Sequence, residues 1–383
     1  MVPTTRTQSS NREIFGAHYD EGRITRGTES DPIWAVLTQK SIERYRELEK
    51  SSETGCLVVG EKNKEFMTTI KLNAQEQNLR LAHLENINQI KSRFPFYNFN
   101  VNDEAVFEEN NSGHISPRSL IKAQQIIAKR NRCDIIDDIV CDVKRVVDQD
   151  GRYHMEVCLE SGKRYAARKV LVTSGAFINL RRLLGSFMTC DIKLRPITVA
   201  KVEISEQDAR KIGSMPSTVY DGRGGAGWCQ EFPKGSSGNT WFYMLPPIKY
   251  PDGKFYLKLG HYAPDVPREL TTGQEVKDWY CSEGDQDIIK ATAKIILDVV
   301  KGVKMQSYHG DCCIITETPT NRPYIDMVHS QLGLAIGGNG HGAKSSDEVG
   351  RIAAMMMLKG SWETTLPKDA FKLKLRWPGY ASK

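Results

Sequence analysis

The sequence predicts a mixed α/β or α+β fold built from two domains. Segments with helical spacing and segments with strand alternation follow one another along the chain without an internal repeat. The 383 residues exceed what one compact domain commonly needs. In addition, residues 330–356 have the pattern of a strand, a glycine-rich turn and a helix.

The elements expected along the chain follow from local patterns. Residues 31–50 carry apolar side chains at helical spacing, 55–60 form an apolar strand, and 75–94 predict one or two helices. Ser116 and Pro117 predict the start of a helix to about residue 130, because serine caps a helix and proline fits its first turn. The later elements are strands at 140–147, 153–159 and 164–172 with hairpin turns at 148–151 and 161–162, strand-rich stretches at 191–206 and 240–262, and a helix at 286–302.

The glycine-rich turn is the most informative stretch. Residues 332–336 predict a strand, and a helix opened by Ser345 or Ser346 follows the turn. Glycines let the backbone approach a ligand closely, and a helix start offers unpaired N–H groups. Together they predict a site for an electron-rich ligand group, although a plain strand-to-helix connection would have the same pattern. The turn contains Gly337, Gly338, Gly340, His341, Gly342 and Lys344.

Two other strands end in informative residues. Residues 169–184 predict an apolar strand that ends in Thr-Ser-Gly-Ala, with Gly175, and runs into a helix. Residues 256–262 predict a strand in which Lys258 lies on the face opposite Leu257 and Leu259. Lys258 therefore lies either at a sheet edge facing water or in a cavity.

Composition excludes several classes of protein. Apolar residues make up 39% and charged residues 26%, which is typical of a globular protein, and no apolar run is long enough to span a bilayer. The net charge of +6 is spread along the chain, which argues against nucleic acid as a partner. We see no secretory signal, and the C-terminal Ala381-Ser382-Lys383 is one leucine short of a peroxisomal signal. We therefore expect a protein of the peroxisome or cytoplasm.

The cysteines and the remaining motifs give little indication of a catalytic or metal site. Nine cysteines without a CxxC pair or zinc-like spacing predict mostly buried, reduced thiols and no metal site. Gly222, Gly224 and Gly227 match GxGxxG, but no clear strand precedes them and a proline follows, so we expect a surface loop. No GxSxG or HExxH motif supports a hydrolase.

The chain shares six short motifs, in the same order, with a known family of enzymes. They are Gly22-Arg23-Ile24-Thr25-Arg26, the strand Thr54–Gly60, Val106-Phe107-Glu108 with Ser112-Gly113, Leu257-Lys258-Leu259-Gly260, Cys313 in Cys-Ile-Ile-Thr, and Gly340-His341-Gly342 with Lys344. From about Gly22 to Lys359, the chain resembles the flavin-dependent amine oxidases of the monomeric sarcosine oxidase and pipecolate oxidase group.

The resemblance implies an FAD enzyme that oxidises a secondary amino acid such as sarcosine, pipecolate or proline, with oxygen reduced to hydrogen peroxide. Lys258 would activate oxygen, Arg26 and Lys344 would hold the substrate carboxylate, and Tyr243 would border the substrate pocket. Cys313 would join covalently to the flavin. The residues implied in cofactor binding are Cys313, Arg23, Gly338, Gly340, His341, Gly342, Lys344 and Gly175. We expect a monomer with a small amino-acid substrate and no membrane or nucleic-acid partner.

Simpler interpretations exist for the same residues. Lys258 could be an edge-strand charge, Arg23 and Arg26 solvated loop charges, and Cys313 an inert core thiol, since only one side chain of the Cys312–Cys313 pair can face a ring. Cys313 is preferred because the Cys-x-x-Thr spacing fits it. A loop at 246–253 is longer than in the family and blurs the match at Tyr243. His261-Tyr262 reverses the family's order, which leaves the pocket histidine open.

The largest departure is at the start of the chain. The family opens with a strand, GxGxxG and a helix, which hold the FAD pyrophosphate. No such unit precedes Arg23, and roughly 30 residues are missing or replaced relative to that pattern. Three explanations follow. The sequence could be an incomplete gene model, a splice form that cannot hold FAD, or a protein that holds flavin mainly through Cys313. We favour the first. We expect the chain as written to bind FAD weakly or to be poorly stable.

Two alternative functions follow. The first is an inactive or FAD-deficient relative that acts as a binding or regulatory protein. The second is a flavin dehydrogenase that uses an acceptor other than oxygen. We expect an FAD-binding domain from 1–54, 107–186 and 305–383, interleaved with a substrate domain that is built on a large mixed sheet from 55–106 and 187–304. The flavin ring would rest between the turn near Gly340 and Lys258.

Overall fold

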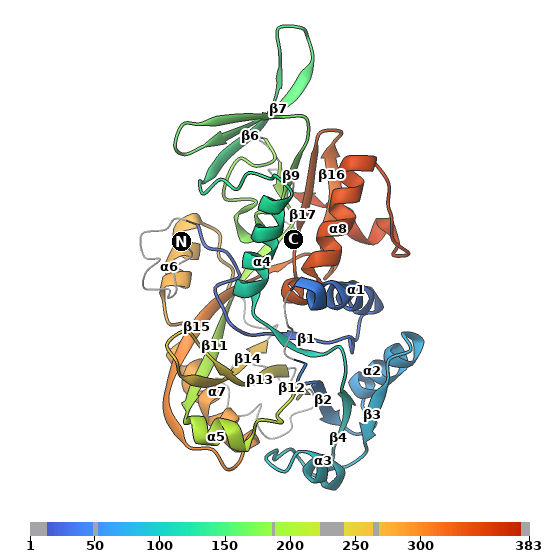
Figure 1. The fold of residues 1–383 in the computed structure, drawn as a ribbon, viewed down its shortest axis with the longest axis vertical. Coiled ribbons are helices and arrows are strands. Elements are labelled where there is room, and N and C mark those ends of the chain that lie inside the picture. Colours follow the sequence, from blue (N-terminus) through green and yellow to red (C-terminus); the bar gives the residue numbers. More distant parts are fainter. Residues whose placement is uncertain (1–13, 49–52, 186–187, 223–240, 263–267, 377–383) are drawn as a thin grey trace. The chain divides into compact units, whose positions relative to one another are not determined.

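The computed structural model describes residues 14–48, 53–185, 188–222, 241–262 and 268–376 (Figure 1). These residues fall into two compact units. The first unit draws on 1–124, 196–268 and 278–313, and the second on 125–195, 269–277 and 314–383. The mixed α/β fold with a large mixed sheet is confirmed. The assignment of an FAD-binding and a substrate domain stays a prediction.

An eight-stranded sheet forms the centre of the first unit. Its strands β12 and β2 are parallel, whereas β14 pairs antiparallel with β11 on one side and β13 on the other. Strand β14 is therefore interior to the sheet. In spatial order the strands are β15 (Met305–Glu317), β11 (Lys193–Ile204), β14 (Phe255–Tyr262), β13 (Trp241–Lys249), β12 (Ser217–Asp221), β2 (Cys56–Glu61), β4 (Asp103–Glu108) and β3 (Leu81–Leu84).

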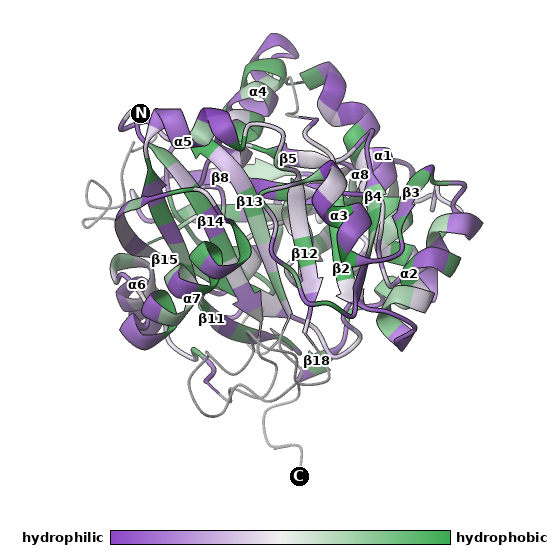
Figure 2. Ribbon diagram, turned by 90° about the horizontal axis from the view of Figure 1, so that it is seen from below, coloured by the Kyte–Doolittle hydropathy of each residue, from purple (hydrophilic) through white to green (hydrophobic). Residues whose placement is uncertain are grey.

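The two faces of this sheet are covered differently. Leu57 and Leu257 belong to a large apolar core that includes Ile296 of α7 (Gln286–Val299). Figure 2 colours much of β2 and β14 as hydrophobic. On the opposite face, Val58 packs with Met67 of α2 (Glu65–Glu76). Because side chains alternate along a strand, this second face also receives the side chain of the residue that follows Leu257.

The remaining elements of the first unit surround the sheet. A short strand β1 (Arg23–Thr25) pairs antiparallel with β5 (Gly113–Ile115). This pair fixes the chain just after residue 22. The helices are α1 (Pro32–Leu48), α3 (Ile87–Arg93) and α5 (Glu206–Lys211), while α4 (Pro117–Arg130) and α6 (Gly273–Cys281) contain residues of both units.

The second unit has a small sheet covered by one helix. Strand β17 (Leu332–Ile336) lies between β16 (Tyr324–His329), which is antiparallel to it, and β9 (Val170–Val172), which is parallel to it. Helix α8 (Gly342–Lys359) contacts all three strands (Figure 1). The unit also contains the meander β6 (Val140–Val147), β7 (Tyr153–Leu159) and β8 (Arg164–Ala167), the pair β10 (Thr189–Cys190) and β18 (Leu375–Arg376), and 3₁₀ turns at Gly175–Phe177 and Lys368–Phe371.

Several expected elements are corrected by the structure. The stretch 75–94 holds strand β3 between two helices, because pairing with β4 overrides its helical spacing. Residues 164–172 form two strands, and 169–184 contain only a 3₁₀ turn after β9. Helix α8 starts at Gly342 instead of Ser345 or Ser346. Residues 246–249 continue β13 through a bulge instead of forming a loop.

Two further expectations change. A buried strand, β12, does precede Gly222, so that ground for rejecting the GxGxxG match was wrong; residues 223–240 lie outside the described part of the chain. Most described cysteines are not buried: Cys56, Cys190 and Cys312 are, whereas Cys133, Cys141, Cys158, Cys281 and Cys313 are exposed or partly exposed. Within the residues that the structure describes, no helix combines the length and apolar character needed to cross a bilayer.

Gly310 of β15 offers a test of this packing. A Cβ atom built there would lie 1.9 Å from the carbonyl oxygen of Glu283 and 2.3 Å from Cδ1 of Ile289. We expect Gly310→Ala to lower the free energy of unfolding by about 1–3 kcal/mol, because the backbone before α7 must shift. Gly350→Ala is the matched control: nothing lies within 4 Å of its added Cβ, so we expect a gain of about 0.5–1 kcal/mol in helix α8. Urea unfolding measures both, and a loss no larger in Gly310→Ala than in the control would contradict the packing.

Candidate active site

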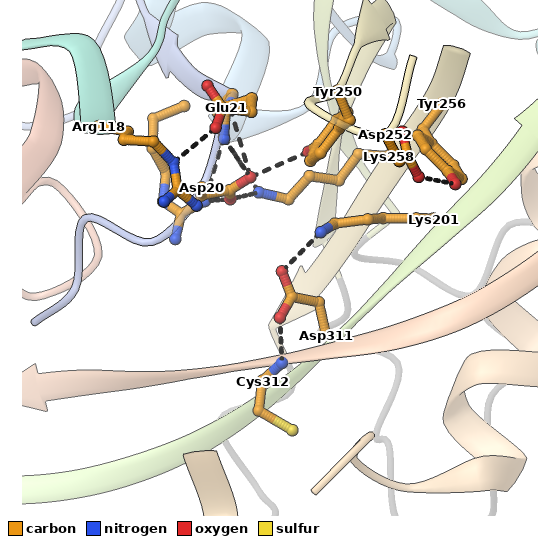
Figure 3. A network of polar contacts seen from close by, with 12 residues as sticks. Asp20, Glu21, Arg118, Lys201, Tyr250, Asp252, Tyr256, Lys258, Asp311 and Cys312 are labelled. Atoms are coloured by element: carbon orange, nitrogen blue, oxygen red, sulfur yellow. Dashed lines mark hydrogen bonds and ion pairs between the residues drawn. The ribbon is translucent and has the colours of Figure 1, made fainter. Parts of the chain in front are cut away.

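Lys258 lies at the centre of a polar cluster in the first unit. It projects from β14 on the face opposite the large apolar core, and 0% of the residue is exposed. Its Nζ donates to the carbonyl oxygen of Gly22 at 3.0 Å. It also pairs with the carboxylate of Asp20, as Figure 3 shows. The interpretation of Lys258 as a solvent-facing edge charge is therefore wrong, because β14 is interior to its sheet.

The Asp20 carboxylate collects donors from several directions. The hydroxyl of Tyr250 donates to Oδ1 at 2.9 Å, and the backbone N–H of Glu21 donates to the same oxygen at 2.8 Å. The guanidinium of Arg23 pairs with the other oxygen, as Lys258 does. Asp20 itself is only 2% exposed. These contacts stabilise the ionised form of a buried carboxylate.

A second lysine lies directly across from the first. In the pairing of β11 with β14, Lys201 is opposite Lys258, so both ammonium groups project from the same buried face. Like charges in such positions repel. Lys201 is paired with the carboxylate of Asp311 on β15 at 2.9 Å. Lys258 thus pairs with Asp20, which it shares with Arg23, and Lys201 pairs with Asp311 (Figure 3).

Burial dominates the titration of this cluster. It lowers the pKa of Lys258 well below the ordinary lysine value, and the positive charges of Arg23 and Lys201 act in the same direction. Asp311 and Cys313 oppose this effect. Burial also raises the pKa of Tyr250, so its hydroxyl stays protonated and can donate to Asp20.

Arg23 and Arg26 differ in their surroundings. Arg23 lies on β1 with 21% of its side chain exposed. Arg26 is 8% exposed, so its interpretation as a solvated loop charge is wrong. Its guanidinium donates to the carbonyl oxygen of Thr28 and pairs with the carboxylate of Glu29 at 3.2 Å, while its buried Nε has no hydrogen-bond partner among the described residues.

Glu108 anchors the turn that follows Arg26. Its carboxylate accepts hydrogen bonds from the backbone N–H groups of Gly27 and Thr28, both at 2.9 Å, and from the hydroxyl of Thr28 at 2.9 Å. Burial raises the pKa of Glu108 against the effect of these bonds. The sequence pattern included Glu108 but gave no sign of this role, since its partners are about 80 residues away.

The two adjacent cysteines face different surroundings. Cys312 is 0% exposed, and its thiol donates to the carbonyl oxygen of Ser282 at 3.3 Å. Cys313 is partly exposed, and its carbonyl oxygen accepts a bond from Nε1 of Trp279 at 3.0 Å. Both cysteines border a small pocket whose wall includes Arg23, Phe15 and Tyr280. The rings of Phe15 and Tyr280 are stacked with centroids 5.2 Å apart.

Tyr243 also lies close to Lys258. Its ring centroid is 5.9 Å from the lysine Nζ. Gly260, opposite Tyr243 in the pairing of β13 with β14, leaves room for the ring, since an added Cβ would lie 2.6 Å from it. Burial raises the pKa of Tyr243. His261, the next residue along β14, is buried and has a pKa lowered to about 4 by burial, so it is neutral near pH 7.

The glycine-rich turn lies in the second unit, at the carboxyl end of β17. Gly337 and Gly340 have positive φ values of 81° and 79°, which favour glycine. Asn339, which the sequence analysis missed, donates to the carbonyl oxygen of Gly337 at 2.6 Å and accepts from the backbone N–H of Thr318 at 2.8 Å. Gly338 is within the turn, and the Cα of Gly342 lies 3.2 Å from its added Cβ position.

The start of α8 completes this turn. His341 is the residue before the helix, Gly342 is its first residue and Lys344, which is 5% exposed, lies in its first turn. The hydroxyl of Ser345 donates back to the carbonyl oxygen of His341 at 2.9 Å, so Ser345 is inside the helix and does not open it.

The parallel partner strand ends at the same edge of the sheet. After β9 come Ser174, whose buried Oγ has no partner among the described residues, and Gly175, with a φ of 55°. The carboxyl ends of parallel strands form the ligand-binding edge of α/β sheets. An unpaired hydroxyl, glycine turns and helix N–H groups fit a ligand that offers acceptor oxygens, as FAD does. Among the described residues, no cluster of His, Cys, Asp and Glu could hold a metal ion.

The predicted site residues thus form two groups. Lys258, Arg23, Tyr243 and Cys313 gather in the first unit, where Arg26 also lies. Gly338, Gly340, His341, Gly342, Lys344 and Gly175 belong to the second unit. The placement of a flavin ring between these groups stays a prediction.

Known proteins resemble this chain over most of its length. The family model described as FAD dependent oxidoreductase matches residues 7–356. The monomeric sarcosine oxidase of Bacillus sp. (strain B-0618) is 27% identical over 364 residues, which cover 91% of this chain and 84% of that protein. A probable sarcosine oxidase of Arabidopsis thaliana is 26% identical over 64% of this chain and 55% of its own length.

Solved structures share the fold. NikD, described as an unusual amino acid oxidase essential for nikkomycin biosynthesis, superposes with a TM-score of 0.71 at 15% identity, covering 96% of this chain and 89% of that one. The L-proline dehydrogenase of P. horikoshii has a TM-score of 0.66 at 15% identity, with 91% and 84% covered.

His114 of β5 offers a test of the β1–β5 pair that fixes Arg23. It lies opposite Ile24 of β1, its Nδ1 has no partner among the described residues, and burial lowers its pKa to about 4. Between pH 6.5 and 4 the unfolded chain binds this proton more strongly, so stability falls as the pH is lowered. We expect protonation of His114 to lower the free energy of unfolding by about 3 kcal/mol between pH 6.5 and pH 4. Urea unfolding of wild type and His114→Gln at several pH values measures it, and parallel curves for the two proteins would refute it.

Proposed function

The chain belongs to the family of FAD-dependent oxidoreductases, and we propose that it oxidises the C–N bond of a secondary amino acid such as sarcosine, pipecolate or proline. The substrate gives up a hydride equivalent and a proton and becomes an imine, which water hydrolyses. Oxygen gains two electrons and two protons and leaves as hydrogen peroxide. The sarcosine oxidases among its relatives support this class of substrate.

The observation that carries the proposal is the buried Lys258. A lysine on an interior strand is costly to bury, and a second lysine directly opposite adds to that cost. Strongly shifted titratable groups in such surroundings are typical of functional sites. Cys313, Arg23 and Tyr243 lie around it.

FAD, when bound, supplies the chemistry of accepting the electron pair from the C–N bond. The second unit would hold it through the turn at Gly338–Gly342 and the N–H groups at the start of α8, which favour negative charge. Cys313, the more exposed of the two adjacent cysteines, is the thiol that would attach to it. Arg23 borders the same small pocket as Cys313 and would add positive charge there.

Substrate orientation would depend on Arg26 and Lys344. An amino-acid carboxylate needs cationic donors, and a guanidinium can bind it with two parallel bonds. Arg26 holds the carboxylate of Glu29 and keeps an unpaired buried Nε, so binding a substrate there requires an exchange of partners. Tyr243, beside Lys258, would border the bound substrate.

Lys258 would stabilise the negative charge that oxygen gains as it is reduced, since a fixed cation in a dry site interacts strongly with developing charge. The Asp20 carboxylate already balances part of the positive charge of Lys258. Because this pairing weakens the attraction of Lys258 for reduced oxygen, a second candidate function is a dehydrogenase that passes electrons to an acceptor other than oxygen.

Lys258→Met tests the oxidase against the dehydrogenase. In protein loaded with FAD and reduced by substrate, we expect the variant to react with oxygen about 100-fold more slowly or worse, while reduction by the amino acid changes little. Lys254→Met is the matched control, because Lys254 lies just before β14 with 52% of its side chain exposed. Stopped-flow absorbance and a peroxide assay give the rates. Wild-type protein that reduces a dye but forms no peroxide would favour the dehydrogenase.

The cysteine pair tests covalent attachment. After acid precipitation, we expect the wild-type pellet to keep its flavin absorbance, Cys313→Ser to lose it, and Cys312→Ser to keep it, because the Cys312 thiol is buried against Ser282. Loss of flavin colour from the pellets of both variants would mean that the two cysteines are needed only for folding. A colourless wild-type pellet would show that the flavin is not covalently bound.

A further inference from the structure

The polar cluster on the buried sheet face contains three cationic side chains and two carboxylates. Lys258 and Lys201 are opposite each other on neighbouring strands; Asp20 pairs with Lys258 and also with Arg23, and Asp311 pairs with Lys201. Asp311 is part of the same sheet, on β15, so its place is fixed by strand pairing. Asp20 precedes β1 and reaches the cluster from outside the sheet.

Asp20 is held by more than its ion pairs. Its carboxylate oxygens accept bonds from Tyr250 and from the backbone N–H groups of Glu21 and Gly22, at 2.9, 2.8 and 3.4 Å. The carbonyl oxygen of Gly22 accepts a bond from Lys258, so a short segment contacts the ammonium group twice. Such a carboxylate has little freedom to turn away.

We propose that Asp20 is the positioning residue for Lys258: its carboxylate favours the protonated form of the buried ammonium group and holds it on the sheet face beside Tyr243. The inference concerns the same site as the proposed oxidase and rests on it for the role of Lys258 in the oxygen reaction. The charge linkage between Asp20 and Lys258 stands on the contacts alone.

The neighbouring Glu21 separates this role from a general need for negative charge. Its carboxylate accepts bonds from Nε of Arg118 at 2.6 Å and from the hydroxyl of Ser116 at 3.0 Å. Those partners lie at the start of α4, and within the described part of the chain the Glu21 carboxylate makes no hydrogen bond or ion pair with either lysine. Glu21→Gln therefore removes a carboxylate one position away and leaves the cluster intact.

Several titratable groups contribute to the potential at Lys258, and they come from the segment at β1 and from β11, β13 and β15 on the same side of the sheet. Removing Asp20 leaves more positive than negative charge among them. They are Asp20 and Arg23 near β1, Lys201 on β11, Tyr243 on β13, Tyr250 after β13, and Asp311 and Cys313 on β15.

The first test measures proton linkage on the full chain. Urea unfolding between pH 6 and 10 is compared for wild type, Asp20→Asn, Glu21→Gln and Asp20→Asn/Lys258→Met. Burial already makes the native state hold the Lys258 proton less tightly than the unfolded chain does, and removing Asp20 weakens that hold further. We therefore expect the unfolding equilibrium constant of Asp20→Asn to fall by up to tenfold per pH unit as the pH rises, starting at lower pH than in wild type.

The double variant and the control complete this test. We expect Glu21→Gln to parallel wild type and the added slope to vanish in Asp20→Asn/Lys258→Met, because no ammonium group remains to titrate. If Asp20→Asn does not fold, we expect the double variant to fold, since removing Lys258 as well returns the net charge of the cluster to its wild-type value. Parallel curves for Asp20→Asn and wild type, a slope that persists in the double variant, or a double variant that also fails to fold would overturn the proposal.

The second test uses FAD-loaded protein. We expect Asp20→Asn to move the alkaline fall of the oxygen-reaction rate by at least one pH unit toward lower pH, with Glu21→Gln unchanged, whereas a purely structural role would lower the rate equally at all pH values. An equal loss at all pH values would overturn the positioning role. Wild-type protein that forms no peroxide but shows the proton linkage would refute the oxidase and support the Asp20–Lys258 linkage.

Discussion

The need to balance the buried charge of Lys258 organises the candidate site. Strand β14 is interior to its sheet, so the lysine cannot reach water, and a second lysine lies opposite it. An isolated ammonium in such a place would lose its proton. Asp20, Asp311 and the hydroxyl of Tyr250 supply the compensating contacts, and they bring the segment before β1 onto the sheet.

The same contacts explain how distant parts of the first unit are joined. Asp20 and Arg23 fix the chain at the sheet, β1 pairs with β5, and Glu108 at the end of β4 holds the turn after Arg26. A loss at any of these points would therefore disturb both the lysine and the arginines proposed to act with it. Stability and chemistry are linked here through buried charges.

Local patterns predicted much of the fold and part of the site. Helix α1, strand β17 and the hairpins of β6–β8 agree with periodicity and turn residues, because these signals lie within each segment. Strand β3 and the early start of α8 were missed, since pairing with β4 and the turn geometry decide them. Asp20 had no signal: an Asp-Glu pair in a polar stretch resembles a solvated loop, and its partner is 238 residues away.

The central proposal is that Lys258 acts on a bound flavin. A crystal structure of the protein loaded with FAD tests it most directly. The account predicts Nζ of Lys258 in contact with the isoalloxazine ring directly or through one water molecule, with the Asp20 carboxylate paired with the lysine. A ring bound away from Lys258, with the Lys258–Asp20 ion pair unchanged and no channel from the ring to the lysine, would contradict the account.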